Sequence, residues 1–210
     1  ADGFSANNLG ADVEAVIYST AYDENHPERK AAEKRGLSTW SYPEVVGILF
    51  EVYPQSISVA GSHGKTTTTA LLSNVLIEAG YSPTALVGST VVDWKSNARA
   101  GSSQWFILET DEYQNKFQYY HPRYVMITNV DYDHPDYFPD RASYEKVFVD
   151  FVTKIPEDGA LVVWGEEPFL PALKAAAKCT VITYGDGAGN DWQLSNVVVN
   201  ERGTSFKANG

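Results

Sequence analysis

Short apolar runs alternate with longer amphipathic runs along most of this chain. Runs such as 105–109 and 160–164 have the length and the apolar content of buried strands. Runs such as 65–79 and 144–154 have the length and the spacing of apolar residues that are typical of helices. Because strands alternate with helices, the pattern predicts an α/β fold with a mostly parallel sheet flanked by helices.

The same pattern predicts the position of each element. We expect strands at 13–19, 37–40, 56–60, 84–87, 105–109, 124–128, 160–164 and 181–184, and a closing hairpin at 192–200 and 204–207. We expect helices at 27–35, 42–52, 65–79, 144–154 and 169–178, and a polar loop from 88 to 101. In helix 65–79 the predicted buried face consists of Ala70, Leu71, Val75, Leu76 and Ala79.

The pattern predicts a domain boundary near residue 53, because Pro54 follows one strand–helix unit and precedes another. Residues 1–52 contain only two predicted strands, too few for a stable sheet of their own, so we read them as the second half of a split domain. Residues 53–210 form the next domain, which we expect to be incomplete at its C-terminus. The chain is therefore expected to be a fragment.

The stretch from Ser56 to Thr69 runs from an apolar strand directly into a glycine-rich turn. Gly61 and Gly64 allow a tight turn that directs backbone N–H groups at phosphate oxygens. Lys65 supplies a charge for the outer phosphates, and the Thr66 hydroxyl can bind Mg²⁺. The spacing G-x-x-G-K-T is a shortened variant of the P-loop, and it predicts ATP and Mg²⁺ as ligands.

Two further strand ends carry polar side chains that suit a metal near phosphates. The strand 105–109 leads into Glu109, Asp111 and Glu112, and the strand 124–128 leads into Asn129, Asp131, Asp133, His134 and Asp136. Taken singly, such residues are usually solvated loop charges or helix caps. Because ligands gather at the carboxyl edge of a parallel sheet, we expect the two groups to lie beside the phosphate loop, with Glu109 as a metal ligand.

Composition excludes several other classes of function. The chain has 27 acidic and 16 basic residues, a net charge of −11, and no basic stripe that would follow a nucleic-acid backbone. It has one cysteine, Cys179, which suits a reducing compartment, and we expect a cytoplasmic location. No apolar run reaches membrane-spanning length, and the N-terminus has no signal-peptide pattern, so we expect no membrane insertion.

Four motifs together resemble the Mur ligase family over nearly the whole chain. They are Ala60-Gly-Ser-His-Gly-Lys-Thr-Thr-Thr-Thr69, Ser96-Asn-Ala-Arg-Ala-Gly101, Glu109-Thr-Asp-Glu-Tyr113 and Thr128-Asn-Val-Asp-Tyr-Asp-His-Pro-Asp-Tyr-Phe138. The resemblance implies that residues 1–52 are the end of a UDP-sugar-binding, Rossmann-like domain and that 53–210 are the central ATP-binding domain. The resemblance also implies that the family's C-terminal, amino-acid-binding domain is not among these residues, and we expect the fragment alone to be inactive.

The resemblance also implies a reaction and roles for particular residues. It implies an ATP-dependent, amide-forming ligase of peptidoglycan synthesis that joins L-alanine to UDP-N-acetylmuramate through an acyl phosphate. The implied catalytic residues are Lys65, Glu109 and His134, and the implied metal ligands are Thr66, Glu109 and His134. The implied nucleotide-binding residues are Gly61, Ser62, His63, Gly64, Lys65, Thr66, Thr67 and Asn129, and the implied contacts to the sugar nucleotide are His63, Asn97 and Arg99.

Two other functions stay open. One is the related ligase that attaches a recycled tripeptide to UDP-N-acetylmuramate, and the other is a non-catalytic nucleotide-binding module. A GTPase is disfavoured because the chain has no Asn-Lys-x-Asp motif. Some family members use a carbamylated lysine, but we read Lys146, at roughly the corresponding place, as a surface residue. The sequence leaves the oligomeric state open.

Overall fold

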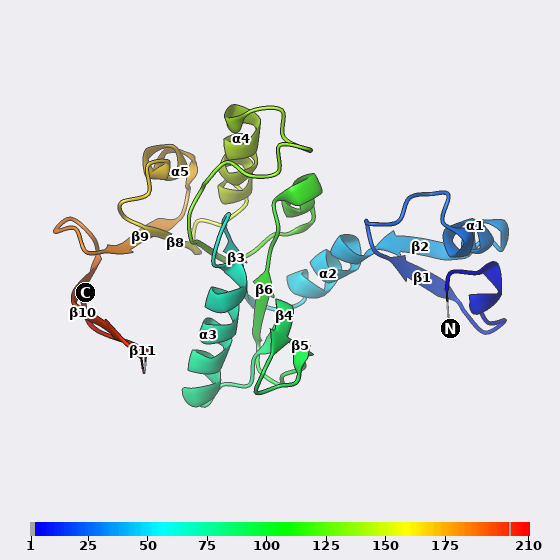
Figure 1. Cartoon of the computed structure of the whole chain (residues 1–210), viewed down its shortest axis with the longest axis horizontal. Helices are drawn as coiled ribbons and strands as arrows, with labels where there is room; N and C mark the ends of the chain where they lie inside the picture. The colour runs from blue at the N-terminus through cyan, green and yellow to red at the C-terminus, as the bar shows by residue number, and fades with distance from the viewer. Residues whose placement is uncertain (1–2, 202) are drawn as a thin grey trace. The chain divides into compact units, whose positions relative to one another are not determined.

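The computed structural model describes residues 3–201 and 203–210 (Figure 1). The chain divides into two compact units, residues 1–49 and residues 50–210. Helix α2 (Tyr42–Glu51) crosses the division. Among the described residues, no helix combines the length and the apolar character needed to cross a membrane.

The first unit is a small βαβ arrangement. It contains η1 (Ala6–Asn8), β1 (Ala15–Tyr18), α1 (Pro27–Lys34) and β2 (Ser38–Ser41), and β1 pairs in parallel with β2. Both strands and the helix lie within two residues of their predicted positions. The guanidinium of Arg35, just after α1, donates hydrogen bonds to the carbonyls of Leu9 and Gly10. These bonds hold the segment after η1 against the end of α1.

The second unit is built on a mostly parallel sheet, as the sequence predicts. Its strands are β3 (Gln55–Ala60), β4 (Thr84–Val91), β5 (Ser96–Arg99), β6 (Trp105–Glu109), β7 (Tyr124–Ile127), β8 (Ala160–Trp164), β9 (Thr180–Gly185), β10 (Trp192–Asn200) and β11 (Gly203–Asn209). Over the described residues the strand order is β11-β10-β9-β8-β7-β3-β6-β4-β5. In the part of this sheet that the structure describes, the antiparallel pairs are β10 with β11 and β4 with β5, one at each outer side of the sheet.

The helices of this unit are α3 (Lys65–Glu78), α4 (Arg141–Val152) and α5 (Leu170–Ala176), with the 3₁₀ helix η2 (Tyr113–Tyr119). Connections between parallel strands are right-handed, and this rule puts α3 on one face of the sheet and α4 and α5 on the other. Helix α3 packs on β3, β4 and β6, whereas α4 packs on α5 and η2 (Figure 1). Because the central strands are parallel, the carboxyl ends of β3, β6 and β7 lie side by side at the same end of the sheet, which we call its carboxyl edge.

The structure corrects the predicted loop at residues 88–101. Strand β4 continues to Val91, and β5 returns antiparallel beside it with an irregular register between Leu86 and Val91. Polar residues are common on an edge strand that has water on one side, which is why residues 88–101 read as a loop. The segment η2 was also not predicted; it consists of two short helical turns on either side of a kink at Gln114 and Asn115, whose backbone is left-handed, and turns this short leave no periodic pattern of apolar residues.

The predicted buried face of α3 is wrong for Leu71, Val75 and Ala79, which are exposed, whereas Leu76 packs against the buried cluster of Val59, Ala85 and Ile107 as predicted. Leu71 and Val75 are each 61% exposed, and the fully buried side chains of the helix are Thr69 and Ser73. Their hydroxyls donate hydrogen bonds to the carbonyls of Lys65 and Thr69, one turn earlier, so the polar groups are satisfied without water. Their methyl and methylene carbons can therefore pack against the sheet.

Candidate functional site

The phosphate loop connects the end of β3 to the start of α3, and its two glycines have different structural requirements. Gly61 has φ +130°, and a Cβ at this position would lie 2.1 Å from Oγ1 of Thr128. Gly64 has φ +81° and caps the N-terminus of α3, where a Cβ would meet open space. Gly61 is therefore required for close packing against Thr128 and Asn129, just after β7, and Gly64 is required only for the left-handed backbone.

Residues after β7 hold the loop in this shape. Oδ1 of Asn129 accepts a hydrogen bond from the N–H of His63 at 2.9 Å, and Nδ2 of Asn129 donates to the carbonyl of His63 at 3.0 Å. The hydroxyl of Thr128 donates to the same carbonyl at 2.6 Å. Asn129, predicted to bind nucleotide, thus binds both the backbone N–H and the backbone carbonyl of His63. The side chain of His63 is exposed.

Lys65 begins α3 and folds back over the loop. Its Nζ donates hydrogen bonds to the carbonyls of Gly61 and Ser62 at 2.6 and 3.3 Å. The same nitrogen lies 3.2 Å from Oε2 of Glu112, and the Glu112 side chain is fully buried. The ammonium group is therefore placed inside the curve of the loop, where phosphate oxygens would come.

Glu109, at the end of β6, lies directly across from the first turn of α3. Oγ1 of Thr66 donates to Oε1 of Glu109 at 2.8 Å, and the N–H of Gly88 donates to Oε2. The structure thus brings together the hydroxyl and the carboxylate that were predicted to bind the same Mg²⁺. Two hard oxygen donors beside a phosphate loop suit Mg²⁺, which is usually held by one or two protein oxygens together with phosphates and water.

The buried carboxylate of Glu112 connects the loop to helix α4. The hydroxyl of Tyr144 donates to Oε1 of Glu112 at 2.9 Å and lies 2.6 Å from Oγ of Ser62. The Ser62 hydroxyl also donates to the carbonyl of Asp131. Burial is the main cause that raises the pKa of Tyr144, so the phenol stays protonated and can donate to the carboxylate.

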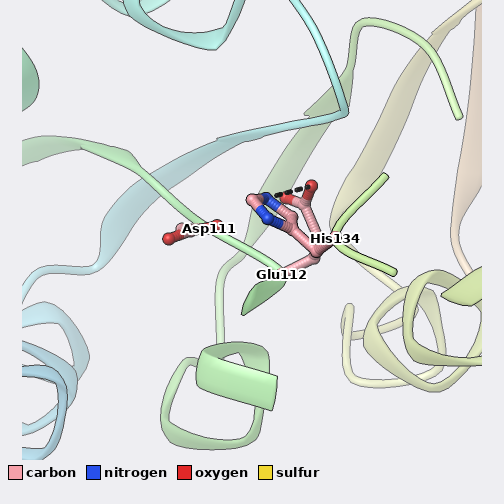
Figure 2. Close-up of side chains that lie close together, drawn as sticks. All are labelled: Asp111, Glu112 and His134. Carbon is pink, nitrogen blue, oxygen red and sulfur yellow. Dashed lines mark ion pairs between the residues drawn. The ribbon is translucent and has the colours of Figure 1, made fainter. Parts of the chain in front are cut away.

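His134 approaches the same carboxylate from the loop after β7 (Figure 2). Its Nε2 lies 4.0 Å from Oε1 of Glu112, and the imidazole faces that carboxylate in Figure 2. Ligand atoms of Asp111, Glu112 and His134 all lie within 4.8 Å of one another. Oxygen and imidazole donors at this separation suit a divalent metal ion.

The backbone of His134 is strained in a way that fits a functional position. Its φ of +55° places a non-glycine residue in the left-handed region, where the cost is of order 1 to 3 kcal/mol. The N–H groups of Tyr137 and Phe138 both donate to the carbonyl of His134, which holds this conformation. The ring of Tyr113 lies 4.8 Å from the imidazole and limits its rotation.

The predicted metal ligands therefore fall into two neighbouring groups. Thr66 and Glu109 form one group, and His134 lies with Asp111 and Glu112 in the other. The remaining members of the predicted nucleotide set surround the first turn of α3, with Thr67 exposed there. All of these residues belong to the second unit and lie at the carboxyl edge of its sheet.

Two predicted substrate residues lie on β5, apart from this cluster. Asn97 is exposed, and Nη1 of Arg99 donates to the carbonyl of Pro83 at 2.6 Å. Pro83 precedes β4, so this contact lies at the amino-terminal ends of the parallel strands, whereas the phosphate loop lies at their carboxyl ends. Lys146, read as a surface lysine, is exposed and forms an ion pair with Asp150 one turn further along α4.

Three contributors to the site were not assigned roles from the sequence. Glu112 was placed in an acidic cluster, but its burial and its contact with Lys65 depend on tertiary structure. Tyr144 gives no local signal, because one tyrosine near the start of a helix resembles any core residue. Gly88 is needed because a Cβ there would lie 2.5 Å from the carboxylate of Glu109.

This arrangement is that of an α/β nucleotide-binding protein, with a phosphate loop facing carboxylates on the neighbouring strand ends. Residues 59–209 match the protein family described as the Mur ligase middle domain. The chain therefore belongs to the Mur ligase family. The family assignment confirms the resemblance inferred from the four motifs.

Curated relatives carry a more specific name. The UDP-N-acetylmuramate–L-alanine ligase of Desulfitobacterium hafniense is 38% identical over 204 residues, covering 97% of this chain and 44% of the relative. The ligase of the same name from Frankia alni is 40% identical and covers 94% of this chain and 34% of the relative. The chain thus spans less than half the length of these relatives.

Solved structures agree on the fold. A UDP-N-acetylmuramate:L-alanyl-γ-D-glutamyl-meso-diaminopimelate ligase of Neisseria meningitides superposes with a TM-score of 0.83 and 27% identity, covering 99% of this chain and 68% of that one. A UDP-N-acetylmuramate–alanine ligase of Thermotoga maritima superposes with a TM-score of 0.80 over 99% of this chain and 46% of that one. Its identity of 20% supports the fold alone.

Proposed function

We propose that this chain is part of a ligase that uses ATP to join L-alanine to UDP-N-acetylmuramate in peptidoglycan synthesis. The observation that carries the proposal is the convergence of Lys65, Thr66 and Glu109 at one sheet edge, with His134 beside Glu112. Support for the particular ligase comes from the 38% and 40% identity to relatives that carry this name.

The chemistry of amide formation explains these residue types. A carboxylate is a poor electrophile. Transfer of the γ-phosphoryl group of ATP to a carboxylate oxygen releases ADP and forms an acyl phosphate, and attack by an amine then forms the amide bond, with loss of phosphate and of a proton from the nitrogen. Phosphoryl transfer between two anions depends on cations that position and neutralise them. Lys65 would hold the outer phosphates, and Thr66 and Glu109 would hold an Mg²⁺ that neutralises part of their charge. His134 would hold a second ion near the acyl phosphate.

The other assignments in the proposal rest on motif position. Asn129 and Ser62 would act mainly by shaping the loop around the nucleotide, since both bind its backbone or the adjacent chain. The exposed His63 would contact the nucleotide or the acyl phosphate, and Asn97 and Arg99 the sugar nucleotide. We propose that residues 1–52 belong to the domain that binds UDP, and that L-alanine binds in a part of the protein outside these 210 residues.

The second candidate is the ligase that attaches a tripeptide to UDP-N-acetylmuramate. The favouring observation is the superposition with the Neisseria ligase, with a TM-score of 0.83 over 99% of this chain. Its identity of 27% is lower than the 38% and 40% identity to the L-alanine ligases, so we favour L-alanine. A non-catalytic module is disfavoured because the phosphate-loop lysine and the surrounding carboxylates are all present.

A chimaeric enzyme tests the proposal. Residues 1–210 would replace the aligned segment of the Desulfitobacterium ligase, and phosphate release would be measured with UDP-N-acetylmuramate, ATP and L-alanine. We expect L-alanine-dependent release that is lost with Lys65→Ala and Glu109→Ala but not with Lys146→Ala, which removes an exposed lysine. A folded chimaera that binds ATP but releases no phosphate would support the non-catalytic module instead.

A further inference from the structure

Glu112 has a cationic partner that the proposed reaction would remove. The carboxylate is fully buried, and Oε2 contacts Nζ of Lys65 at 3.2 Å. Its other oxygen accepts a neutral hydrogen bond from Tyr144. A buried charge is tolerated in a protein only if it is paired, and Lys65 is the cationic group that contacts this carboxylate at 3.2 Å.

Nucleotide phosphates would compete with Glu112 for the same ammonium group. Lys65 sits in the curve of the loop, where it also donates to the carbonyls of Gly61 and Ser62. If the Lys65 ammonium group binds phosphate oxygens and leaves Glu112, Oε2 of Glu112 loses its contact with a positive charge while the carboxylate remains buried. Since Tyr144 is neutral, another cation is then needed near Glu112.

The surroundings of Glu112 can accommodate that cation. Nε2 of His134 lies 4.0 Å from Oε1 of Glu112, and a carboxylate oxygen of Asp111 completes a group within 4.8 Å. Asp111 also pairs with Lys116 at 2.7 Å, and both of these side chains are partly exposed, unlike that of Glu112. The ring of Tyr113 keeps the imidazole near this group.

We propose that Lys65 and a divalent cation compete for the Glu112 carboxylate, so that nucleotide binding creates the cation site by withdrawing Lys65. This inference rests on the proposed function, because it assumes that Lys65 binds phosphate. Glu112 is then a positioning residue for Lys65 in the empty loop and a cation ligand in the loaded one. Nucleotide and the ion at Asp111, Glu112 and His134 bind cooperatively.

The competition can be tested with the metal alone. Mn²⁺ binding would be followed by the loss of the free-ion electron paramagnetic resonance signal, without nucleotide. We expect Lys65→Met to bind Mn²⁺ about tenfold more tightly than the wild type, because the carboxylate is released from its partner. The matched control is Lys146→Met, which removes the same charge from an exposed ion pair and should change nothing.

A double variant assigns the gain to Glu112. Lys65→Met combined with Glu112→Gln should bind Mn²⁺ no more tightly than the wild type. The proposal is overturned if Lys65→Met gains no Mn²⁺ affinity, or if the gain persists in the double variant and so belongs to the neighbouring pair of Thr66 and Glu109.

A second measurement uses ADP in excess EDTA. In the wild type, metal-free ADP must leave Glu112 without a cation, so we expect Glu112→Gln to bind ADP about tenfold more tightly. A purely structural role for Glu112 predicts the opposite change, and that result would overturn the inference. Wild-type protein that binds no ADP under any condition would contradict the proposed function, and the Mn²⁺ experiment would still decide whether Lys65 and the metal compete.

Discussion

The backbone of Gly88 donates a hydrogen bond to the carboxylate of Glu109, and the two groups are too close to admit a side chain between them. A Cβ at residue 88 would lie 2.5 Å from Oε1 of Glu109. That oxygen is also the acceptor for the Thr66 hydroxyl. The position of Glu109, the proposed Mg²⁺ ligand on β6, therefore depends on Gly88, which lies on β4.

Replacing this glycine should impair metal-dependent binding without unfolding the protein. In Gly88→Ala we expect the carboxylate of Glu109 to be displaced, and the Mg²⁺-dependent part of ADP affinity to fall about tenfold by calorimetry. Gly189→Ala is the matched control, because a Cβ there meets nothing within 4 Å. Equal affinities in the two variants would show that Glu109 does not need this placement.

The two glycines of the phosphate loop should differ in their effect on stability. Gly64→Ala places a side chain in open space at φ +81°, so it should cost about 1 to 2 kcal/mol of unfolding free energy. Gly61→Ala adds a contact of 2.1 Å with Thr128 and should cost at least about 1 kcal/mol more. Urea denaturation at neutral pH measures both, and a smaller loss for Gly61→Ala would contradict the packing described here.

Tyr144→Phe should reveal the buried hydrogen bond to Glu112. The variant leaves the oxygen Oε1 of a buried carboxylate without this donor, and we expect a loss of about 1.5 to 3 kcal/mol of unfolding free energy. In the control Tyr132→Phe, the hydroxyl that is lost donates to the neutral carbonyl of Phe138, so the expected loss is about 1 kcal/mol. Equal losses would contradict a stronger hydrogen bond from Tyr144 to the Glu112 carboxylate.

Stability should fall in acid partly through the cap of α4. The N–H of Ser143 donates to Asp140, and this bond is the main cause that lowers the pKa of Asp140 below its ordinary 3.8. A lowered folded-state pKa means that the stabilisation is present above the ordinary value and is lost as pH falls through the folded value. Asp140→Asn keeps an oxygen cap without titrating. Its unfolding free energy should decline less than that of the wild type between about pH 6 and about pH 2. Parallel declines would contradict this role.

The sequence predicted those parts of the fold and of the site that depend on residues close together in the chain. The turn at Gly61 and Gly64, the lysine at the start of α3 and the carboxylate at the end of β6 are each specified by a few consecutive residues. The order of apolar runs likewise predicted a mostly parallel α/β sheet, and the family assignment confirms the resemblance to Mur ligases.

Long-range contacts explain what the sequence did not predict. Thr69 and Ser73 were overlooked as buried residues because their polarity suggests exposure, whereas their hydroxyls are satisfied within the helix. The role of Glu112 depends on Lys65, 47 residues earlier, and on Tyr144, 32 residues later. No spacing rule connects three such positions, because the sheet brings them together only after folding.

Lys65 and Glu109 are proposed to form an Mg²⁺-dependent nucleotide site, and this can be measured by calorimetric titration of the 210-residue protein with a non-hydrolysable ATP analogue. We predict binding of one analogue that weakens without Mg²⁺, is lost in Lys65→Ala, and loses most of its Mg²⁺ dependence in Glu109→Ala. Lys146→Ala should bind like the wild type, since its ammonium pairs with Asp150 on an exposed face. Binding that is equally strong in the wild type and in Lys65→Ala would contradict the account, as would a wild type that binds no analogue with or without Mg²⁺.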